Sequence, residues 1–207
     1  MPNGYSAHED NSSKRCKQLI WTIYQQSVTI AAIMTNLQYP VGKFEIKPGT
    51  TKEQRRALID SIAQTPVRLG AAISNLSTKQ LDEPYRPDGW TIRQVVHHLP
   101  DSHLNAYTRF KLGLTEAEPT IKPYDENRWA MLEDGQHADP EVSLVLLDAL
   151  HKRWVICLRS AAPEDFARTL RHPEIGTLSL DGLLQLYEWH GRHHVAHITS
   201  LRERKGW

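Results

Sequence analysis

The sequence predicts an all-α protein, a four-helix bundle with long crossover connections and room for one small β-hairpin. Apolar residues recur at helical spacing in four long segments, whereas few stretches alternate as strands do. Long helices joined by long connections are typical of bundles, whose cores can hold metal sites. With 207 residues, of which 40% are hydrophobic, the chain is long enough to bury one core. We therefore expect one main folded domain.

The first two helices are expected over residues 51–77 and 91–114. Thr51 is a suitable N-cap for the first, and Pro66 predicts a kink or break midway along it. The segment DEPYRPDGW is dense in turn residues and places Thr91 as the cap of the second helix. The residues that share one face of the second helix are Ile92, Val95, Val96, Leu99 and His103.

The third helix is expected to begin at Asp139, because aspartate caps helices and Pro140 suits the first helical position. Its apolar stripe continues to Leu158. The connection over residues 115–138 has room for one short helical turn in YDENRWAML. After the third helix, ARTLRHPEIGTLSL alternates around a Pro-Gly turn and predicts the small hairpin.

The fourth helix lies at the end of the chain and carries four histidines in eight residues. Positions separated alternately by four and three stack along one face of a helix, so three of these histidines share a seam with apolar residues. His193 lies about 60° from that seam, which places it nearer the rim. The residues of the seam are Leu183, Tyr187, His190, His194, His197 and Leu201.

Three histidines on one apolar seam favour a metal site over ordinary core packing. A single buried histidine is usually satisfied by one hydrogen bond. Three of them each need a polar partner, whereas one metal ion satisfies several at once. Two histidines one turn apart can share an ion only if another helix supplies a further ligand, so a third ligand is expected elsewhere in the chain.

The second helix offers that further ligand in the segment VVHHLPDSH. His97 projects furthest from the apolar face, His98 stands at its edge, and His103 lies near its centre. Spacing prefers His103 as the buried residue and leaves His98 ambiguous. From the chemistry of the residues alone, the choice between His98 and His103 stays open.

Composition narrows the partners of the protein. The net charge is +1, and the sequence has no block of like charge that would indicate binding to nucleic acid or to an anionic membrane surface. A small-molecule substrate is therefore expected. Cys16 and Cys157 are far apart, and no C-x-x-C occurs, which suits a reducing cytoplasm. Residues 1–33 are too polar to span a bilayer. We expect them to be an extension, or the product of an upstream start codon.

Several segments together resemble the YfiT branch of the DinB-like superfamily, described as metal-dependent hydrolases and including bacillithiol S-transferases. These segments are GWTIRQVVHHLPDSHLNAYTRFKLGL, PYDENRW, HPEIG and LYEWHGRHHVAHITSLRERKGW. The likeness covers residues 34–207 and begins at MTNLQYPVGKF. It implies a four-helix bundle, a homodimer and one divalent metal per subunit, zinc or else nickel. Carried over residue by residue, it implies that the metal ligands are His98, His190 and His194.

The resemblance settles the choice toward His98 and leaves His103 and His197 as core residues or as hydrogen-bond partners of the ligands. The chain departs from the family at Pro100, which we expect to kink the second helix near His98. Residues 1–33 have no counterpart in it.

Three activities are compatible with such a site. A bound ion could activate water for hydrolysis, hold a low-molecular-weight thiol for transfer to an electrophile, or only staple the bundle. Hydrolysis is the first hypothesis, and no general base is assigned. PYDENRW is a candidate cover for the site. Polar residues that could tune it or contact an anionic substrate are Asp101, Tyr107, Arg109, Tyr187 and Arg192.

Overall fold

The computed structural model describes residues 18, 21, 22, 24 and 37–207 of the chain. The chain divides into two compact units, Met1–Gln38 and Tyr39–Trp207, and the second contains the bundle. The extension predicted at residues 1–33 falls almost entirely outside the described residues, so its role stays a prediction. Within the described part of the chain, no helix is both long and apolar enough to cross a membrane.

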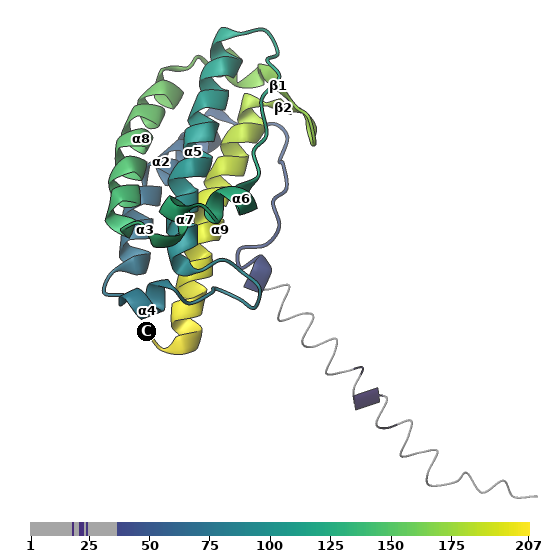
Figure 1. Cartoon of the computed structure of the whole chain (residues 1–207). Helices are drawn as coiled ribbons and strands as arrows, with labels where there is room; N and C mark the ends of the chain where they lie inside the picture. Colours follow the sequence, from purple (N-terminus) through teal and green to yellow (C-terminus); the bar gives the residue numbers. More distant parts are fainter. Residues whose placement is uncertain (1–17, 19–20, 23, 25–36) are drawn as a thin grey trace, which may run out of the picture. The chain divides into compact units, whose positions relative to one another are not determined.

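The second unit is a four-helix bundle, as predicted (Figure 1). Its first member is broken into two helices, and its other three are continuous. The bundle helices are α2 (Lys52–Ala63), α3 (Thr65–Ile73), α5 (Ile92–Thr115), α8 (Pro140–Ser160) and α9 (Leu180–Lys205). The connections hold α4 (Thr78–Leu81), α6 (Glu126–Ala130), α7 (Glu133–His137), the 3₁₀ helix η1 (Pro163–Ala167) and the strands β1 (Thr169–His172) and β2 (Gly176–Ser179).

The order of the helices around the bundle differs from their order in the chain. Helix α5 packs against α8 and α9, and the broken helix α2–α3 packs against the same two helices. The α2–α3 pair and α5 therefore lie at diagonal corners, as do α8 and α9. The connections from α3 to α5 and from α8 to α9 therefore join diagonal helices, and the second of these is one of the two long connections expected. The other long connection, after α5, joins the neighbouring helices α5 and α8. As a result, α5 and α9 lie side by side and their histidines can meet.

The first helix breaks midway, which is one of the two outcomes expected from Pro66, but it ends earlier than residue 77. It breaks at Gln64, and α3 ends at Ile73 instead of near Ser77. The break follows from Pro66, which has no backbone N–H and is accommodated in the first turn of a new helix. Beyond α3 the chain turns, with Asn75 at a positive φ of 62°.

The predicted N-caps of α2, α5 and α8 are confirmed. In each, the side-chain oxygen accepts a hydrogen bond from a backbone N–H in the first turn, a donor that has no partner within the helix. The caps are Thr51, Thr91 and Asp139. Helix α5 remains helical through Pro100 to Thr115, so the proline does not interrupt the helix that carries His98.

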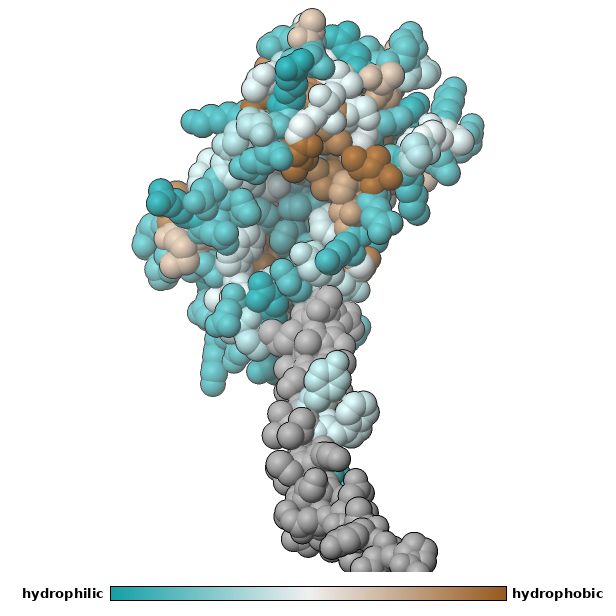
Figure 2. All heavy atoms as spheres, turned by 90° about the vertical axis from the view of Figure 1, so that its right-hand side faces the viewer, coloured by the Kyte–Doolittle hydropathy of each residue, from teal (hydrophilic) through white to brown (hydrophobic). Residues whose placement is uncertain are grey.

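The connections contain the predicted hairpin and three short helices that were not predicted, namely α4, α7 and the 3₁₀ helix η1. Strands β1 and β2 pair antiparallel, and Gly176, the first residue of β2 after the turn, has a φ of 79°. Helix α6 is the helical turn predicted in YDENRWAML, and α7 follows it without having been predicted. Figure 2 views the side of the bundle on which α6 lies, a largely hydrophilic face that is hollowed near its middle beside a patch of apolar side chains.

Two apolar clusters fill the bundle, and a layer of histidines separates them. One cluster is built around Phe110 and Trp154, and the other contains Val95 and Leu99 of α5. Along α9 the first cluster reaches Tyr187, and the second resumes at Val195 and Ile198. His190 and His194 occupy the turn between these two stretches. The fold thus places the imidazoles in a polar layer between two apolar clusters.

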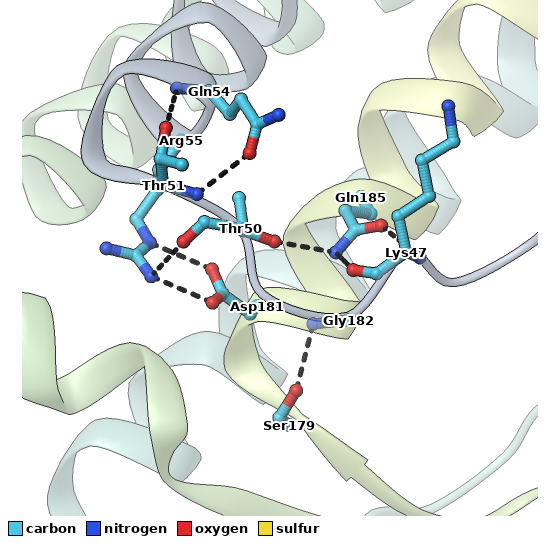
Figure 3. A network of polar contacts seen from close by, with 9 residues as sticks. All are labelled: Lys47, Thr50, Thr51, Gln54, Arg55, Ser179, Asp181, Gly182 and Gln185. Carbon is cyan, nitrogen blue, oxygen red and sulfur yellow. Dashed lines mark hydrogen bonds and ion pairs between the residues drawn. The ribbon is translucent and has the colours of Figure 1, made fainter.

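A polar network fixes the start of α9 against α2 and the segment before it (Figure 3). Nε and Nη2 of Arg55 each donate to the Asp181 carboxylate, at 2.8 Å. The Gln185 amide accepts from the backbone N–H of Lys47 at 2.8 Å and donates to its carbonyl at 3.0 Å. These contacts hold the register of α9, and His190 follows Gln185 by five residues.

Candidate metal centre

Three histidines from two helices meet in the polar layer. His98 comes from α5, whereas His190 and His194 come from α9, one helical turn apart. Each offers a ring nitrogen, and these three nitrogens lie within 4.8 Å of one another. The Nε2 atoms of His98 and His190 are 3.2 Å apart. The structure thus brings together the three side chains that were expected to hold an ion.

The spacing of these nitrogens suits a divalent ion such as zinc. Two histidine nitrogens that each lie about 2.0–2.1 Å from a tetrahedral zinc ion are separated by about 3.3 Å. The separation of 3.2 Å between His98 and His190 agrees with that value. Nδ1 of His194 is buried and has no hydrogen-bond partner among the described residues. A shared ion would give these crowded imidazoles a common partner.

Burial keeps the three imidazoles neutral, which is the form that binds metal. Loss of solvation, together with smaller effects of the neighbouring His193 and His197, lowers the pKa of His98 to about 3. Burial likewise holds the pKa of His190 and His194 well below the ordinary histidine value, with nearby histidines adding to the effect. Each ring therefore keeps one lone pair available at neutral pH.

His103 is buried, as its face position predicts, but it lies outside the group of three. Its side chain is fully buried, and its Nε2 is 3.1 Å from Nδ1 of His190. The apolar-face argument therefore identified a histidine that hydrogen-bonds to the expected ligand His190. The residue at the edge of the face, His98, has its ring nitrogen in the group.

The other predicted orientations need two corrections. His97 was expected to project away from the core, yet it is only 6% exposed. Its Nδ1 is 2.7 Å from Oγ of Ser143, and its Nε2 is 3.1 Å from the carbonyl of Ala138. The segment leading into α8 covers this side of α5 and supplies polar partners, which the spacing of α5 alone cannot reveal.

His193 was expected near the rim and is also buried, at 7% exposed. Its ring stacks on Trp189 at a centroid distance of 4.4 Å and packs beside Tyr39 at 6.0 Å. The segment that precedes α2 lies over this part of α9 and excludes solvent. His197, 2% exposed, stacks on Tyr85 at 3.9 Å, as expected for a core residue.

Most of the polar residues proposed to tune the site have other partners. Arg192 forms an ion pair with Glu188 at 2.7 Å. Burial and the nearby Asp134 raise the pKa of the Asp101 carboxyl to about 6, and no hydrogen bond joins this carboxyl to a described histidine. Tyr107 packs at the edge of the apolar core. None of these three therefore contacts the group of three histidines.

Arg109 and Tyr187 do lie beside the site. The guanidinium donates to the Tyr187 hydroxyl at 2.9 Å, and the Tyr187 ring packs edge-on to His190 with centroids 5.8 Å apart. Tyr124 of the PYDENRW segment also reaches this region, because Ser102 lowers the pKa of both the Tyr124 and the Tyr187 phenol against the effect of burial. Oγ of Ser102 is 3.5 Å from Nε2 of His190. PYDENRW therefore approaches the candidate site through Tyr124, and its role as a cover stays a prediction.

Sequence reasoning missed Trp90 and His151. The Trp90 ring packs on His98 at a centroid distance of 4.7 Å and stacks parallel to His194 at 6.2 Å. His151 of α8 is 1% exposed and bonds to His103 at 2.7 Å. A signal for His151 existed, because it lies three residues before Trp154 on the apolar stripe of the third helix.

Comparisons with known proteins agree with this fold and this cluster. A model of the DinB superfamily matches residues 61–198. A Bacillus cereus (strain B4264) protein named "putative metal-dependent hydrolase" is 54% identical over 174 residues, which cover 84% of this chain and 100% of that protein. A protein of Bacillus thuringiensis subsp. konkukian (strain 97-27) with the same description is 53% identical, with the same coverage.

A solved structure is similar over the same part of the chain. YfiT from Bacillus subtilis, described as "a probable metal-dependent hydrolase with an unusual four-helix bundle topology", superposes with a TM-score of 0.82 at 47% identity. The match covers 83% of this chain and 99% of that one. Sequence, fold and family model therefore agree, and the chain belongs to the DinB superfamily.

Proposed function

We propose that this protein is a metal-dependent hydrolase in which His98, His190 and His194 hold one zinc ion per chain, with nickel as the alternative metal. The observation that carries the proposal is a group of three neutral imidazoles whose ring nitrogens lie within 4.8 Å of one another. Catalytic zinc sites use three protein ligands, whereas structural sites surround the ion with four. The names given to the relatives support the same activity.

A divalent ion held here would supply Lewis-acid chemistry, which includes lowering the pKa of water to about 7. The chain's own residues prepare the site for that ion. Helix α9 presents two donors from one face, and α5 presents the third from across the bundle. Trp90 and Tyr187 pack against the imidazoles and exclude solvent from part of their surroundings. Because the rings are held by packing, little reorganisation is needed when metal binds.

A buried cation beside the site suggests the kind of substrate. Arg109 is only 9% exposed, and it donates to the Tyr187 hydroxyl at 2.9 Å and to the Lys122 carbonyl at 3.3 Å. Neither partner is anionic, and no carboxylate in the described part of the chain forms an ion pair with this guanidinium. A buried charge without a counter-ion is costly. We therefore propose that the substrate carries an anionic group that Arg109 recognises.

The test compares the full chain as purified, after removal of metal by a chelator, and after reloading with zinc or nickel. Each form is assayed against aryl esters and amides in pairs, one bearing a carboxylate and one neutral. We expect hydrolysis that disappears with the metal and returns on reloading, and faster turnover of the carboxylate-bearing partner. Arg109→Met should reduce that preference, whereas Arg159→Met, which changes an exposed arginine of α8, should retain it.

The competing activities have distinct outcomes in the same assay. A parallel arm offers the metal-loaded protein low-molecular-weight thiols with epoxide or haloalkyl acceptors. Thioether formation without hydrolysis would identify a thiol transferase. If neither reaction occurs, and chelation sharply lowers the melting temperature, the ion has only a structural role in stabilising the bundle. Either result would overturn the hydrolase proposal.

A further inference from the structure

A chain of hydrogen bonds leads from the candidate metal centre to the far corner of the bundle. Nδ1 of His190 is 3.1 Å from Nε2 of His103. Nδ1 of His103 is 2.7 Å from Nε2 of His151, and Nδ1 of His151 is 2.8 Å from the carbonyl oxygen of Ile62. These four residues come from α9, α5, α8 and α2, so the chain touches all four members of the bundle.

The last partner sets the direction of every bond in this chain. A carbonyl oxygen only accepts, so Nδ1 of His151 must carry a proton and donate to Ile62. A neutral imidazole carries one proton, which leaves Nε2 of His151 as an acceptor for the N–H at Nδ1 of His103. By the same rule, Nε2 of His103 accepts from Nδ1 of His190. Nδ1 of His190 then carries the proton, and its Nε2 carries a lone pair.

Each ring in the chain is buried enough to remain neutral. His103 is 0% and His151 1% exposed. Burial also lowers the pKa of His151, the ring furthest from the expected ligands, to about 4. No carboxylate takes part in these bonds, and the charge of nearby Asp148, which favours a protonated His151, is outweighed by the burial of the ring. A single neutral arrangement therefore satisfies all three bonds.

This arrangement prepares His190 for a metal ion. Its Nε2 is 3.2 Å from Nε2 of His98, so the unprotonated nitrogen is the one that faces the other expected ligand. In an isolated imidazole the proton can sit on either nitrogen, and a proton on Nε2 would block coordination there. Outer partners of metal-binding histidines usually fix this choice with a carboxylate, a carbonyl or water.

We infer that His103 and His151 are positioning residues that fix His190 with its proton on Nδ1, so that its Nε2 is free to bind the ion. The inference rests on the proposed metal site. It adds a chain of two further histidines that ends on the Ile62 carbonyl. Its loss should weaken metal binding by about 10- to 100-fold, the usual effect of losing an outer partner of a metal ligand.

The first test measures metal affinity of full-length variants by competition with a chromogenic chelator. His151→Leu removes the acceptor for His103 and should weaken zinc binding about 10- to 100-fold. His151→Gln is the conservative variant, because its amide can donate to Ile62 and accept from His103, and it should restore most of the affinity. His97→Gln serves as control, since it changes a buried histidine of α5 outside the chain.

The second test reads the position of the proton directly. In the metal-free wild-type protein, the ¹⁵N shifts of His190 should show a protonated Nδ1 and an unprotonated Nε2. This measurement needs no variant, so it decides the matter even if His151→Leu fails to fold. A protonated Nε2 on His190, or unchanged zinc affinity in a folded His151→Leu protein, would overturn the inference.

A further variant separates this inference from the proposed metal site. His190→Ala should abolish stoichiometric zinc binding if the site itself is correct. Full zinc binding in His190→Ala would refute the site. Loss of zinc in His190→Ala, together with unchanged affinity in His151→Leu, would refute only the role of the histidine chain.

Discussion

His97 and His98 are adjacent in the sequence, but their side chains face different helices. His97 bonds to Ser143 and to the carbonyl of Ala138, whereas His98 faces His190 across the bundle. Both are buried, at 6% and 7% exposed, so burial does not distinguish them. What distinguishes them is the partner that the opposite element provides. His97 has two conventional hydrogen bonds, and so it has no need of an ion.

This difference predicts that Ser143→Ala affects stability without affecting metal binding. The change leaves Nδ1 of His97 buried without its partner at 2.7 Å, which should cost about 1–3 kcal/mol of unfolding free energy. Urea unfolding measures the loss, and elemental analysis should still find one ion per chain. Ser160→Ala is the matched control, because Ser160 lies on the same helix but is exposed, and we expect a change within about 0.5 kcal/mol. Loss of metal in Ser143→Ala would contradict this division of roles.

Between elements, close packing of α9 on α3 holds one edge of the site. Gly191, next to His190, faces Thr65 of α3 so closely that an added Cβ would lie 2.9 Å from its Oγ1 and 3.1 Å from its Cγ2. Separations this short require either the Thr65 side chain or one of the two helices to shift. The absence of a side chain at position 191 therefore lets α9 approach α3 at the level of the histidines.

We predict that Gly191→Ala destabilises the protein by about 1–3 kcal/mol through overpacking. The loss should be smaller when Thr65→Ala is already present, because the nearest remaining side-chain atom, Cβ, would lie 3.6 Å away. Gly70→Ala is the control on α3, where an added Cβ meets only Leu144 at 4.0 Å. It should leave stability unchanged or raise it by up to about 1 kcal/mol. Equal losses from Gly191→Ala in both backgrounds would show that Thr65 is not the obstacle.

The elements themselves could be predicted to the extent that their signals are local. Thr51, Thr91 and Asp139 cap their helices because a short polar side chain next to an apolar stripe suffices to identify them. The hairpin followed from alternation around a turn. The end of α3 and the short helix α7 could not be predicted, because they depend on tertiary contacts that no periodic pattern records.

The candidate site could be predicted only in part, for a related reason. The seam on α9 identified His190 and His194, since helical spacing fixes which residues share a face. Spacing on α5 reports burial and not the direction in which a ring nitrogen points. Spacing therefore favoured His103 as the buried residue and left His98 ambiguous. The resemblance to a family was needed to select His98 as the ligand. The partner of His103 is His151, on a third helix, and the sequence does not show which helices are neighbours.

At the scale of the whole molecule, the buried histidines should make the metal-free protein sensitive to acid. Burial lowers the pKa of His98 and His193 to about 3 and that of His151 to about 4, against about 6.5 in an unfolded chain. Below pH 6.5 the unfolded chain binds protons that the folded chain excludes, so stability falls as pH falls. The contribution of Asp101 to this pH dependence has the opposite sign, because its raised pKa favours the folded state at low pH. The several buried histidines outweigh this single carboxyl.

We therefore predict that the unfolding free energy of the metal-free protein decreases steeply between pH 6.5 and pH 4.5. Each buried histidine can contribute at most about 1.4 kcal/mol per pH unit. Urea titrations at several pH values measure the slope, and His137→Ala, which removes an exposed histidine, should leave it unchanged. An unfolding free energy that does not change over this range would mean that the buried histidines are protonated in the folded protein as readily as in the unfolded chain.

The bundle unit should also fold without the preceding segment. The relatives align over 174 residues, which cover 100% of the Bacillus cereus protein but only 84% of this chain. The three expected ligands and both apolar clusters lie within Tyr39–Trp207. A shortened chain of residues 34–207 should match the full chain in melting temperature and zinc content. A large loss of either would show that the first 33 residues support the bundle.

Elemental analysis of purified variants tests the metal site most directly. Wild-type protein saturated with zinc and then dialysed at neutral pH should hold one ion per chain. His98→Ala, His190→Ala and His194→Ala should each lose it, because a site with two protein ligands is much weaker. His193→Ala should retain it. His197→Ala and His103→Ala should weaken binding without abolishing it at saturating zinc. Full occupancy in His98→Ala, with loss in His103→Ala, would contradict the assignment and place the ion between α9 and His103.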